Sequence, residues 1–235
     1  MQSSLALRRK EERPQTDSEE VTVSARTHGV ALSIAGIIAP IWFITLVIIQ
    51  GILQPDYSHI TMPVSALAAW PAGWMQRLNF YVVAALMAIF AIGVHRTVQP
   101  TRYGMLGIVL LFASCLGQVI AGLFPWIMVN GVPTETKPHV VGAILSFSGA
   151  STGFIALSRR MRADARWRSV AWYVLTTGLV MLILFIVLGA FAIEDGTPLH
   201  PWAGLLQRVV VLLWFACTTT IAFRALRIGS NTSSA

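Results

Sequence analysis

Charged residues are scarce in this sequence and are missing altogether from long stretches of it. Only 11% of the 235 residues are charged and 55% are hydrophobic, against roughly 25% and 45–50% in ordinary soluble domains. Residues 29–53 and 170–193 contain no Asp, Glu, Lys or Arg. A helix of ~20 apolar residues crosses the ~30 Å hydrocarbon layer of a bilayer. The composition therefore excludes an ordinary soluble domain and predicts a multi-pass membrane protein.

Several motifs that would identify a function or a maturation step are also missing. The two cysteines, Cys115 and Cys217, lie in apolar stretches, so we expect buried thiols and no disulfide framework. The sequence has no His-x-x-x-His and no glycine-rich phosphate loop. It opens without a short apolar stretch and a small-residue cleavage site. We therefore expect residues 1–28 to form a disordered cytoplasmic tail.

Hydropathy predicts an all-α bundle of six transmembrane helices within residues 29–227, followed by a short cytoplasmic tail at 228–235. The expected spans are 29–53, 78–94, 103–124, 140–157, 170–193 and 202–223. Pro40 should kink the first of them. The fourth carries small residues at helical spacing, including Gly149-x-x-x-Gly153. Because small residues let helices approach closely in lipid, we place this span at the centre of the bundle.

The basic residues are segregated between the two sides of this bundle. All but three of the 17 Lys and Arg residues fall in the tails and in the second and fourth connections; the exceptions are Arg77, Lys137 and Arg208. The positive-inside rule then places both termini in the cytoplasm, with the chain in the cell membrane. The basic side would face anionic lipid headgroups. This topology accounts for the net charge of +7 without nucleic-acid binding.

Polar residues gather in the three connections of the opposite, outer side. The candidates for a site there are Asp56, His59, His139, Glu194, Asp195 and His200. One hypothesis is a catalytic group of Asp56, His59, His139 and His200, in which the three histidines hold Zn²⁺ and activate a water. His139 shares a helix face with the small residues of the fourth span, and so should face the bundle interior. The alternative is a structural histidine that caps a helix and bonds a carbonyl.

Arg208 is the residue least suited to its predicted position. It lies only about 24 Å of helix from Arg224, less than the ~30 Å hydrocarbon layer, and an arginine inside a membrane is costly. A carboxylate of Asp56, Glu194 or Asp195 would offset that cost. The alternative is an arginine that extends alone toward the interface.

The sequence around Arg208 is partly repeated earlier in the chain. AGLLQR (203–208) opens the sixth span, and AGWMQR (72–77) opens the second. The match indicates an old hairpin duplication or arises by chance. Each copy carries a glutamine and an arginine one turn inside the helix. Gln76 and Arg77 with Gln207 and Arg208 could clamp a carboxylate or phosphate, or each arginine could brace a loop carboxylate.

Several of these segments together carry a resemblance to a known family. PDYSHITMPVSALAA (55–69), GLFP (122–125), His139 with the following VVGA, and GLLQR (204–208) resemble the bacterial and archaeal membrane-protein family catalogued as domain-of-unknown-function family 998. The resemblance covers nearly all of residues 29–227 and implies a multi-pass helical bundle, without an activity. Members commonly carry an acidic residue soon after the Gly-x-Phe-Pro turn. Here Trp126 follows, and the nearest acid is Glu135.

Three kinds of function stay open at this point. The first is a structural or accessory membrane protein, or one that binds a small polar or lipid ligand at its outer face. The second is a membrane-embedded, metal-assisted hydrolase that acts on a lipid or amide at the outer leaflet. The third is a passive transporter or sensor; active transport is disfavoured because no intramembrane carboxylate supplies a proton relay.

Overall fold

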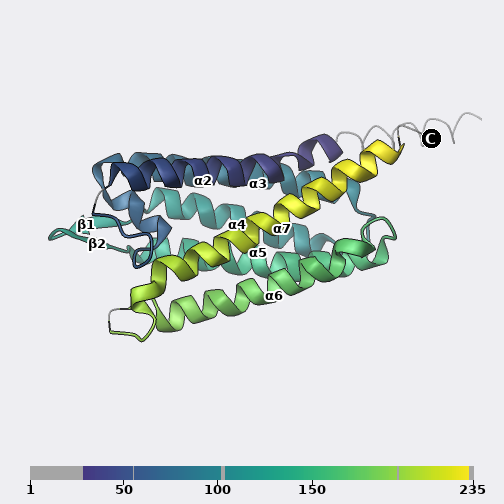
Figure 1. Cartoon of the computed structure of the whole chain (residues 1–235). Helices are drawn as coiled ribbons and strands as arrows, with labels where there is room; N and C mark the ends of the chain where they lie inside the picture. The colour runs from purple at the N-terminus through teal and green to yellow at the C-terminus, as the bar shows by residue number, and fades with distance from the viewer. Residues whose placement is uncertain (1–28, 55, 102–103, 195, 233–235) are drawn as a thin grey trace, which may run out of the picture.

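The computed structural model describes residues 29–54, 56–101, 104–194 and 196–232. The predicted tail at 1–28 and Asp195 lie outside the described residues. The long helices of the protein, coloured in chain order in Figure 1, are α2 (Ala35–Leu53), α3 (Trp74–Thr97), α4 (Met105–Leu123), α5 (Lys137–Ala163), α6 (Arg168–Phe191) and α7 (Ala203–Thr232). Within these described residues, six helices are long and apolar enough to cross a membrane. The all-α bundle predicted from hydropathy is thus confirmed, and α7 continues well past the expected end at residue 223.

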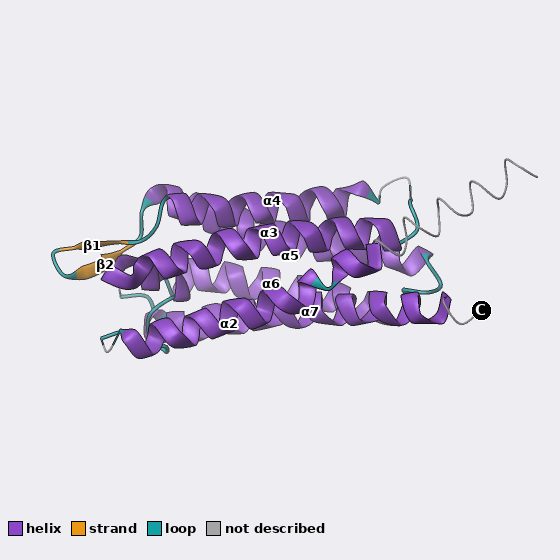
Figure 2. Cartoon of the chain, turned by 90° about the horizontal axis from the view of Figure 1, so that it is seen from above, coloured by secondary structure: helices purple, strands orange, loops and turns teal. Residues whose placement is uncertain are grey.

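The helices run up and down, so that their connections gather at two ends (Figure 1). We call the end formed by connections 54–73, 124–136 and 192–202 the hairpin end. It carries a small antiparallel hairpin of β1 (Ile127–Val129) and β2 (Val132–Thr134), which projects beyond the helices in Figure 2. The opposite end, with connections 98–104 and 164–167 and the end of α7, is the terminal end.

The hairpin turn has a simple local cause. Asn130 and Gly131 both have positive φ, 51° and 81°, as a two-residue type I′ turn requires. Asn-Gly between two short apolar runs is a strong hairpin signal. The hairpin was not among the predicted elements, although this signal stands in the sequence.

Helices α4 and α5 approach so closely that their backbones are nearly in contact. A Cβ on Gly117 would lie 2.4 Å from the Ser146 nitrogen, and one on Gly142 would lie 2.8 Å from the Ala121 nitrogen. Gly149 faces the Ser114 nitrogen in the same way, at 2.8 Å. Helix α5 also packs along α6. The small residues thus mark a closely packed helix, but the central place predicted for α5 is wrong: the helices form a ring of neighbours in which α5 packs on α4 and α6.

Pro40 lies inside α2, which runs unbroken from Ala35 to Leu53. Because proline has no N–H, the carbonyl four residues earlier, that of Gly36, has no intrahelical donor from this position. The Thr219 hydroxyl of α7 donates to that carbonyl at 3.2 Å. The neighbouring helix thus supplies the hydrogen bond that the proline removes, as expected where lipid offers no water.

The terminal end is held by a buried arginine. Arg160 of α5 is 3% exposed, and its guanidinium donates to the carbonyls of His95, Val98 and Gln99. It thereby fixes the connection from α3 to α4 on the end of α5. In the sequence Arg160 indicated only the topology, because its burial depends on how the connection folds.

A carboxylate completes this end of the bundle. Asp164, 1% exposed, accepts from the Gln99 backbone N–H at 3.0 Å and from the Arg166 guanidinium at 2.7 Å. Burial by itself would raise the pKa of Asp164, but these hydrogen bonds and the Arg166 charge outweigh it and lower that pKa below its usual value. Arg224 of α7 in turn donates to the Arg166 carbonyl. Four elements therefore meet at one carboxylate and its arginine partner.

We predict that Asp164→Asn lowers the free energy of unfolding in detergent by about 1–3 kcal/mol at neutral pH, because charged hydrogen bonds to Asp164 are lost. The lowered folded-state pKa makes this contribution present above the ordinary Asp pKa of about 3.9 and lost as the pH falls toward the folded-state value. Melting temperatures measured from pH 7 to pH 3 should show the two proteins converging in acid. The control is Asp56→Asn, at an exposed position. A constant difference at every pH would contradict the prediction.

Candidate functional site

The three connections of the hairpin end fold together over the bundle. The first contains two short 3₁₀ helices, η1 (Val64–Ala69) and η2 (Pro71–Gly73), and η1 contacts β1 and β2 of the second connection. Its backbone is tied to α7 by two hydrogen bonds. The Leu205 N–H donates to the Ile60 carbonyl at 3.0 Å, and the Val64 N–H donates to Gln207 Oε1 at 2.6 Å. Segments far apart in the sequence thus form one cap.

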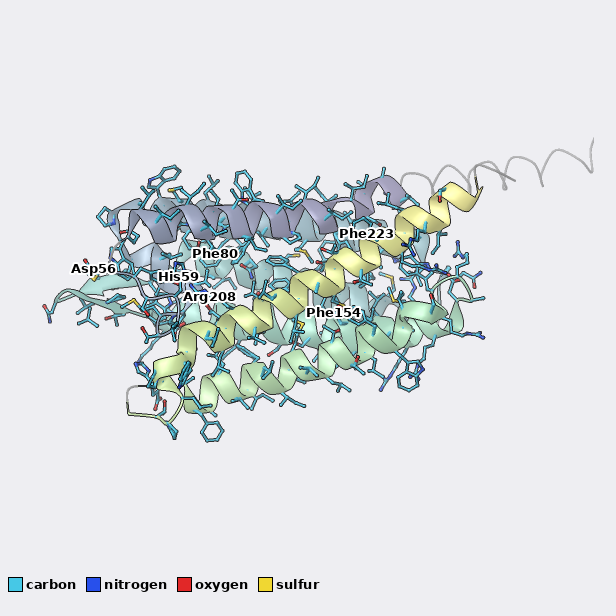
Figure 3. The ribbon with its side chains drawn as sticks, viewed as in Figure 1. Asp56, His59, Phe80, Phe154, Arg208 and Phe223 are labelled. Atoms are coloured by element: carbon cyan, nitrogen blue, oxygen red, sulfur yellow. The ribbon has the colours of Figure 1, made fainter. Side chains whose placement is uncertain are left out.

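Arg208 is the anchor of this cap. Its guanidinium donates to Tyr57 Oη at 2.6 Å, to the carbonyls of Gly204 at 2.9 Å and Met62 at 3.2 Å, and to His59 Nδ1 at 3.0 Å. It also lies over the Tyr57 ring, 5.6 Å from its centroid. The neighbouring positions of His59 and Arg208 can be followed in Figure 3. The partners of the Arg208 guanidinium are therefore an aromatic ring with its hydroxyl, an imidazole nitrogen and two carbonyl oxygens.

The predicted ion pair of Arg208 is not found among the described residues. The ion pairs there are His139 with Glu135 and Arg166 with Asp164. Asp56 is exposed, near the edge of the hairpin end in Figure 3. The third candidate partner, Asp195, lies outside the described residues. Carbonyl oxygens of the folded-back connection take the place of a carboxylate, which a sequence pattern cannot reveal.

The two copies of the AGxxQR pattern occupy corresponding positions under the cap. Gly204 allows the 59–62 backbone to rest on the start of α7, since a Cβ there would lie 2.3 Å from the Met62 oxygen. Gly73 plays the same part at the start of α3, where a Cβ would lie 2.1 Å from the Ala68 oxygen. Arg77 Nε donates to the Gly122 carbonyl at 3.2 Å. Both arginines donate to backbone carbonyls, and neither forms an ion pair with a carboxylate among the described residues.

Gln76 belongs to a buried amide cluster between α2 and α3. Its Oε1 accepts from Gln50 Nε2 at 3.0 Å and from Asn79 Nδ2 at 3.4 Å. All three side chains are buried. Gln207, by contrast, faces the cap and a cavity. The two glutamines and two arginines of the AGxxQR pattern therefore do not form one clamp.

His139 lies where the sequence predicted, facing the bundle interior, and it is 2% exposed. Its Nδ1 lies 3.2 Å from the Ala121 carbonyl and 3.0 Å from that of Phe124. Because a carbonyl only accepts, Nδ1 carries the proton and caps the end of α4. Its Nε2 lies 3.9 Å from Glu135 Oε1. His139 thus bonds carbonyls as a structural histidine would, which was the alternative prediction. It also has a carboxyl partner, Glu135, that was not predicted.

Glu135 is the acidic residue closest to this histidine and lies just before α5. Burial raises the pKa of Glu135 to about 7, so that its carboxyl group titrates near neutral pH. A carboxyl with such a pKa beside an imidazole is an arrangement that can exchange a proton with a ligand. The only sequence signal for it was the four-residue spacing of Glu135 and His139 at a helix start.

The structure does not bring the three outer histidines together. His59 accepts from Arg208, and His200 Nδ1 donates to the Ala192 carbonyl at 3.1 Å. Burial and the Arg208 charge lower the pKa of His59. Across the described ranges, no three His, Cys, Asp or Glu side chains are grouped so that they could hold a metal ion. The proposed zinc site of His59, His139 and His200 is therefore not assembled.

Two surface depressions adjoin Glu135. One, of about 410 Å³, is a groove on the flank of the bundle between α5 and α6, with Gln207 of α7 also in its wall. The other, of about 360 Å³, lies under the cap and is lined by Thr61, Trp126 and His200 among others. Glu135 and Ile193 line both. The carboxyl group therefore stands where the two depressions meet.

The groove has a polar rim and an apolar body. Glu135, Lys137 and Glu194 form the rim; the body is lined by Val140, Ala143, Ile144, Phe147, Phe185, Leu188, Gly189 and Ile193. Ile144 is 52% exposed, so the groove is open along the flank that would face lipid. From Lys137 to Phe147 it follows about 15 Å of helix at 1.5 Å per residue. That is half of the ~30 Å hydrocarbon layer, or one leaflet.

A cavity of about 40 Å³ lies deeper inside the bundle, behind the groove. Ala143, Phe147 and Gln207 line both spaces. Its polar lining is Ser65, Gln118, His139, Ser146 and Gln207. Gln118 and Ser146 were not predicted as site residues, because a lone glutamine or serine in an apolar span gives no signal of what it faces. Their positions are fixed by the packing of α4 on α5.

Comparison with known proteins gives a family but no activity. A family model described as "Protein of unknown function (DUF998)" matches residues 37–224. No curated protein and no solved structure matches the chain.

We predict that Arg208→Lys lowers the free energy of unfolding in detergent by about 1–3 kcal/mol, because a lysine ammonium cannot reach Tyr57, His59 and two carbonyls together. The matched control is Arg227→Lys, an exposed arginine on the same helix. Thermal unfolding of both variants checks the prediction. Equal melting temperatures would mean that the charge alone matters at position 208.

We also predict that Gly204→Ala is strongly destabilising, since its Cβ would collide with the Met62 oxygen. Gly189→Ala is the control, because a Cβ there meets nothing within 4 Å and alanine favours the helix by up to about 1 kcal/mol. The first variant should unfold at a lower temperature than wild type and the second at the same or a higher one. A harmless Gly204→Ala would show that the cap does not need this close approach.

Proposed function

The chain belongs to the DUF998 family, and we propose that it binds an amphipathic, lipid-like ligand in the groove between α5 and α6. The observation that carries the proposal is the two-part lining of this groove. Charged side chains of both signs form its rim, and aliphatic and aromatic side chains form its body. Pockets of this kind orient a ligand through a few polar groups and hold it through apolar contact.

The dimensions and position of the groove support a single acyl chain as the part that is bound. The groove is about as long as one leaflet is deep, and it opens on the helix flank that faces the hydrocarbon. A chain can therefore enter from the bilayer without crossing water. Its polar head would lie beside Lys137, Glu135 and Glu194. Since the rim carries both an ammonium and carboxyl groups, a zwitterionic or uncharged head suits it better than a strongly anionic one.

The proposal includes an orientation in the cytoplasmic membrane. With both termini in the cytoplasm, as the basic residues favour, the hairpin end lies outside and the groove belongs to the outer leaflet. Arginines of the terminal end, such as Arg96, Arg159 and Arg227, would then contact anionic headgroups of the inner leaflet. Labelling of single cysteines with a membrane-impermeant reagent, one at Asn130 and one at Arg227, tests this orientation.

We predict that Gly189→Leu blocks ligand binding. A side chain at position 189 would project into open space within the lining of the groove. A leucine there should therefore fill the groove without disturbing the fold. The measurement is photo-crosslinking in vesicles with a phosphatidylcholine that carries a diazirine in one acyl chain, followed by mapping of labelled peptides. We expect labels on residues 137–147 and 185–193 in wild type, and at least a fivefold loss of those labels in Gly189→Leu (about 1 kcal/mol).

The control is Ala190→Leu, which adds the same side chain at the next, exposed position of α6, outside the residues that line the groove. It should label as wild type does. Labels spread evenly over all lipid-facing helices, and unchanged by Gly189→Leu, would overturn the proposal and leave a structural or accessory role.

A further inference from the structure

The cavity behind the groove has an unusual lining for the interior of a membrane bundle. Its walls combine aromatic rings with uncharged hydrogen-bonding groups; the rings are those of Phe43, Phe80, Phe147, Trp214 and Phe215. No Lys, Arg, Asp or Glu lines it. An ion would therefore be buried without a counter-charge, at a high cost. Any group that binds here is uncharged.

Gln118 is the residue that indicates a ligand. It is 7% exposed, and its Nε2 donates to Ser146 Oγ at 2.7 Å. Its Oε1 is buried and has no hydrogen-bond partner among the described residues. If the amide were turned over, the nitrogen would be the atom left over instead. Either way one polar atom lacks a partner where lipid surrounds the protein, and this costs free energy that a leucine would not.

Gln207 adds a second polar group to the same space. Its Oε1 accepts the Val64 N–H at 2.6 Å, which leaves the amide nitrogen as the donor of this side chain. Gln207 lines the groove as well as the cavity. A group that passes from the groove into the cavity therefore meets Gln207 on its way to Gln118.

We propose that this cavity is a subsite for a hydroxyl group of the amphiphile, placed between its head and its acyl chain. A hydroxyl both donates and accepts, so it suits Gln118 in either orientation together with the Gln207 amide. The volume of about 40 Å³ is a few times the ~10–15 Å³ that one water needs, enough for a hydroxyl and its carbon. This inference rests on the proposed binding of a lipid-like ligand in the groove.

Two probes that differ only in their hydroxyl groups test it. One is a 1-monoacylglycerol with a diazirine in its acyl chain; the other is the same molecule with both hydroxyls methylated. In wild-type protein in nanodiscs, we expect the first probe to label the groove about tenfold more strongly at equal concentration. Gln118→Leu should abolish this preference while both probes still label the groove.

The variants separate this inference from the function on which it rests. Gly189→Leu should reduce labelling by both probes, and its failure to do so would overturn the groove. Equal labelling of the wild type by the two probes, or a preference that survives in Gln118→Leu, would overturn the subsite alone and mean that the cavity holds only water. Thermal unfolding should show that Gln118→Leu is at least as stable as wild type. Ser146→Ala, which removes the Gln118 anchor, is a second variant and should weaken the preference.

Discussion

The close approach of α4 and α5 is the constraint on which the rest of the structure depends. In lipid no hydrophobic force drives helices together, so contact of backbones through glycine takes its place. Gly117 and Gly142 allow that contact near the hairpin end. It brings His139 to the last carbonyls of α4 and brings Gln118 within 2.7 Å of Ser146. The positions of Gln118, His139 and Ser146 in the lining of the cavity follow directly from it.

Arginines close the bundle at both ends, and they do so in a similar way. Arg208 holds the cap of the hairpin end, and Arg160 holds the connection from α3 to α4. Each donates several hydrogen bonds to a folded-back connection: Arg160 to backbone carbonyls, and Arg208 to the Met62 carbonyl and the side chains of Tyr57 and His59. The guanidinium fork is suited to this task because it presents five donors in a fixed plane. Carbonyl groups that neither helix nor sheet satisfies are thereby paired.

The groove and the cavity behind it, which share Ala143, Phe147 and Gln207 in their linings, become less charged from the surface to the interior. Charged groups stand at the rim, a carboxyl group with a pKa of about 7 marks the meeting of the two depressions, and only uncharged polar groups lie inside. Such a gradient follows the rising cost of burying charge with depth. It gives an amphiphile a place for each of its parts. The outer histidines take part in separate hydrogen bonds, and this argues against a hydrolytic metal site at this end.

Much of the fold could be predicted because the lipid environment makes composition decisive. The absence of charge over residues 29–53 and 170–193, and the small residues of 140–157, were enough to predict the spanning helices and the close packing of α5. The resemblance carried by residues 55–69 and 204–208 gave the family, which the match over residues 37–224 confirms. The inward direction of His139 also followed from helix periodicity.

Hydropathy and helical periodicity are local properties, so the sequence by itself determined where the helices lie, which of them packs closely through small residues and which way His139 faces. The tertiary structure alone decided that Arg208 and Arg160 bind carbonyls, that the outer histidines stay apart, and that Glu135 and Gln118 line a neighbouring groove and cavity. These outcomes depend on how connections fold over helix ends. Contacts between residues more than a hundred positions apart, such as Val64 with Gln207, leave no periodic trace in the chain.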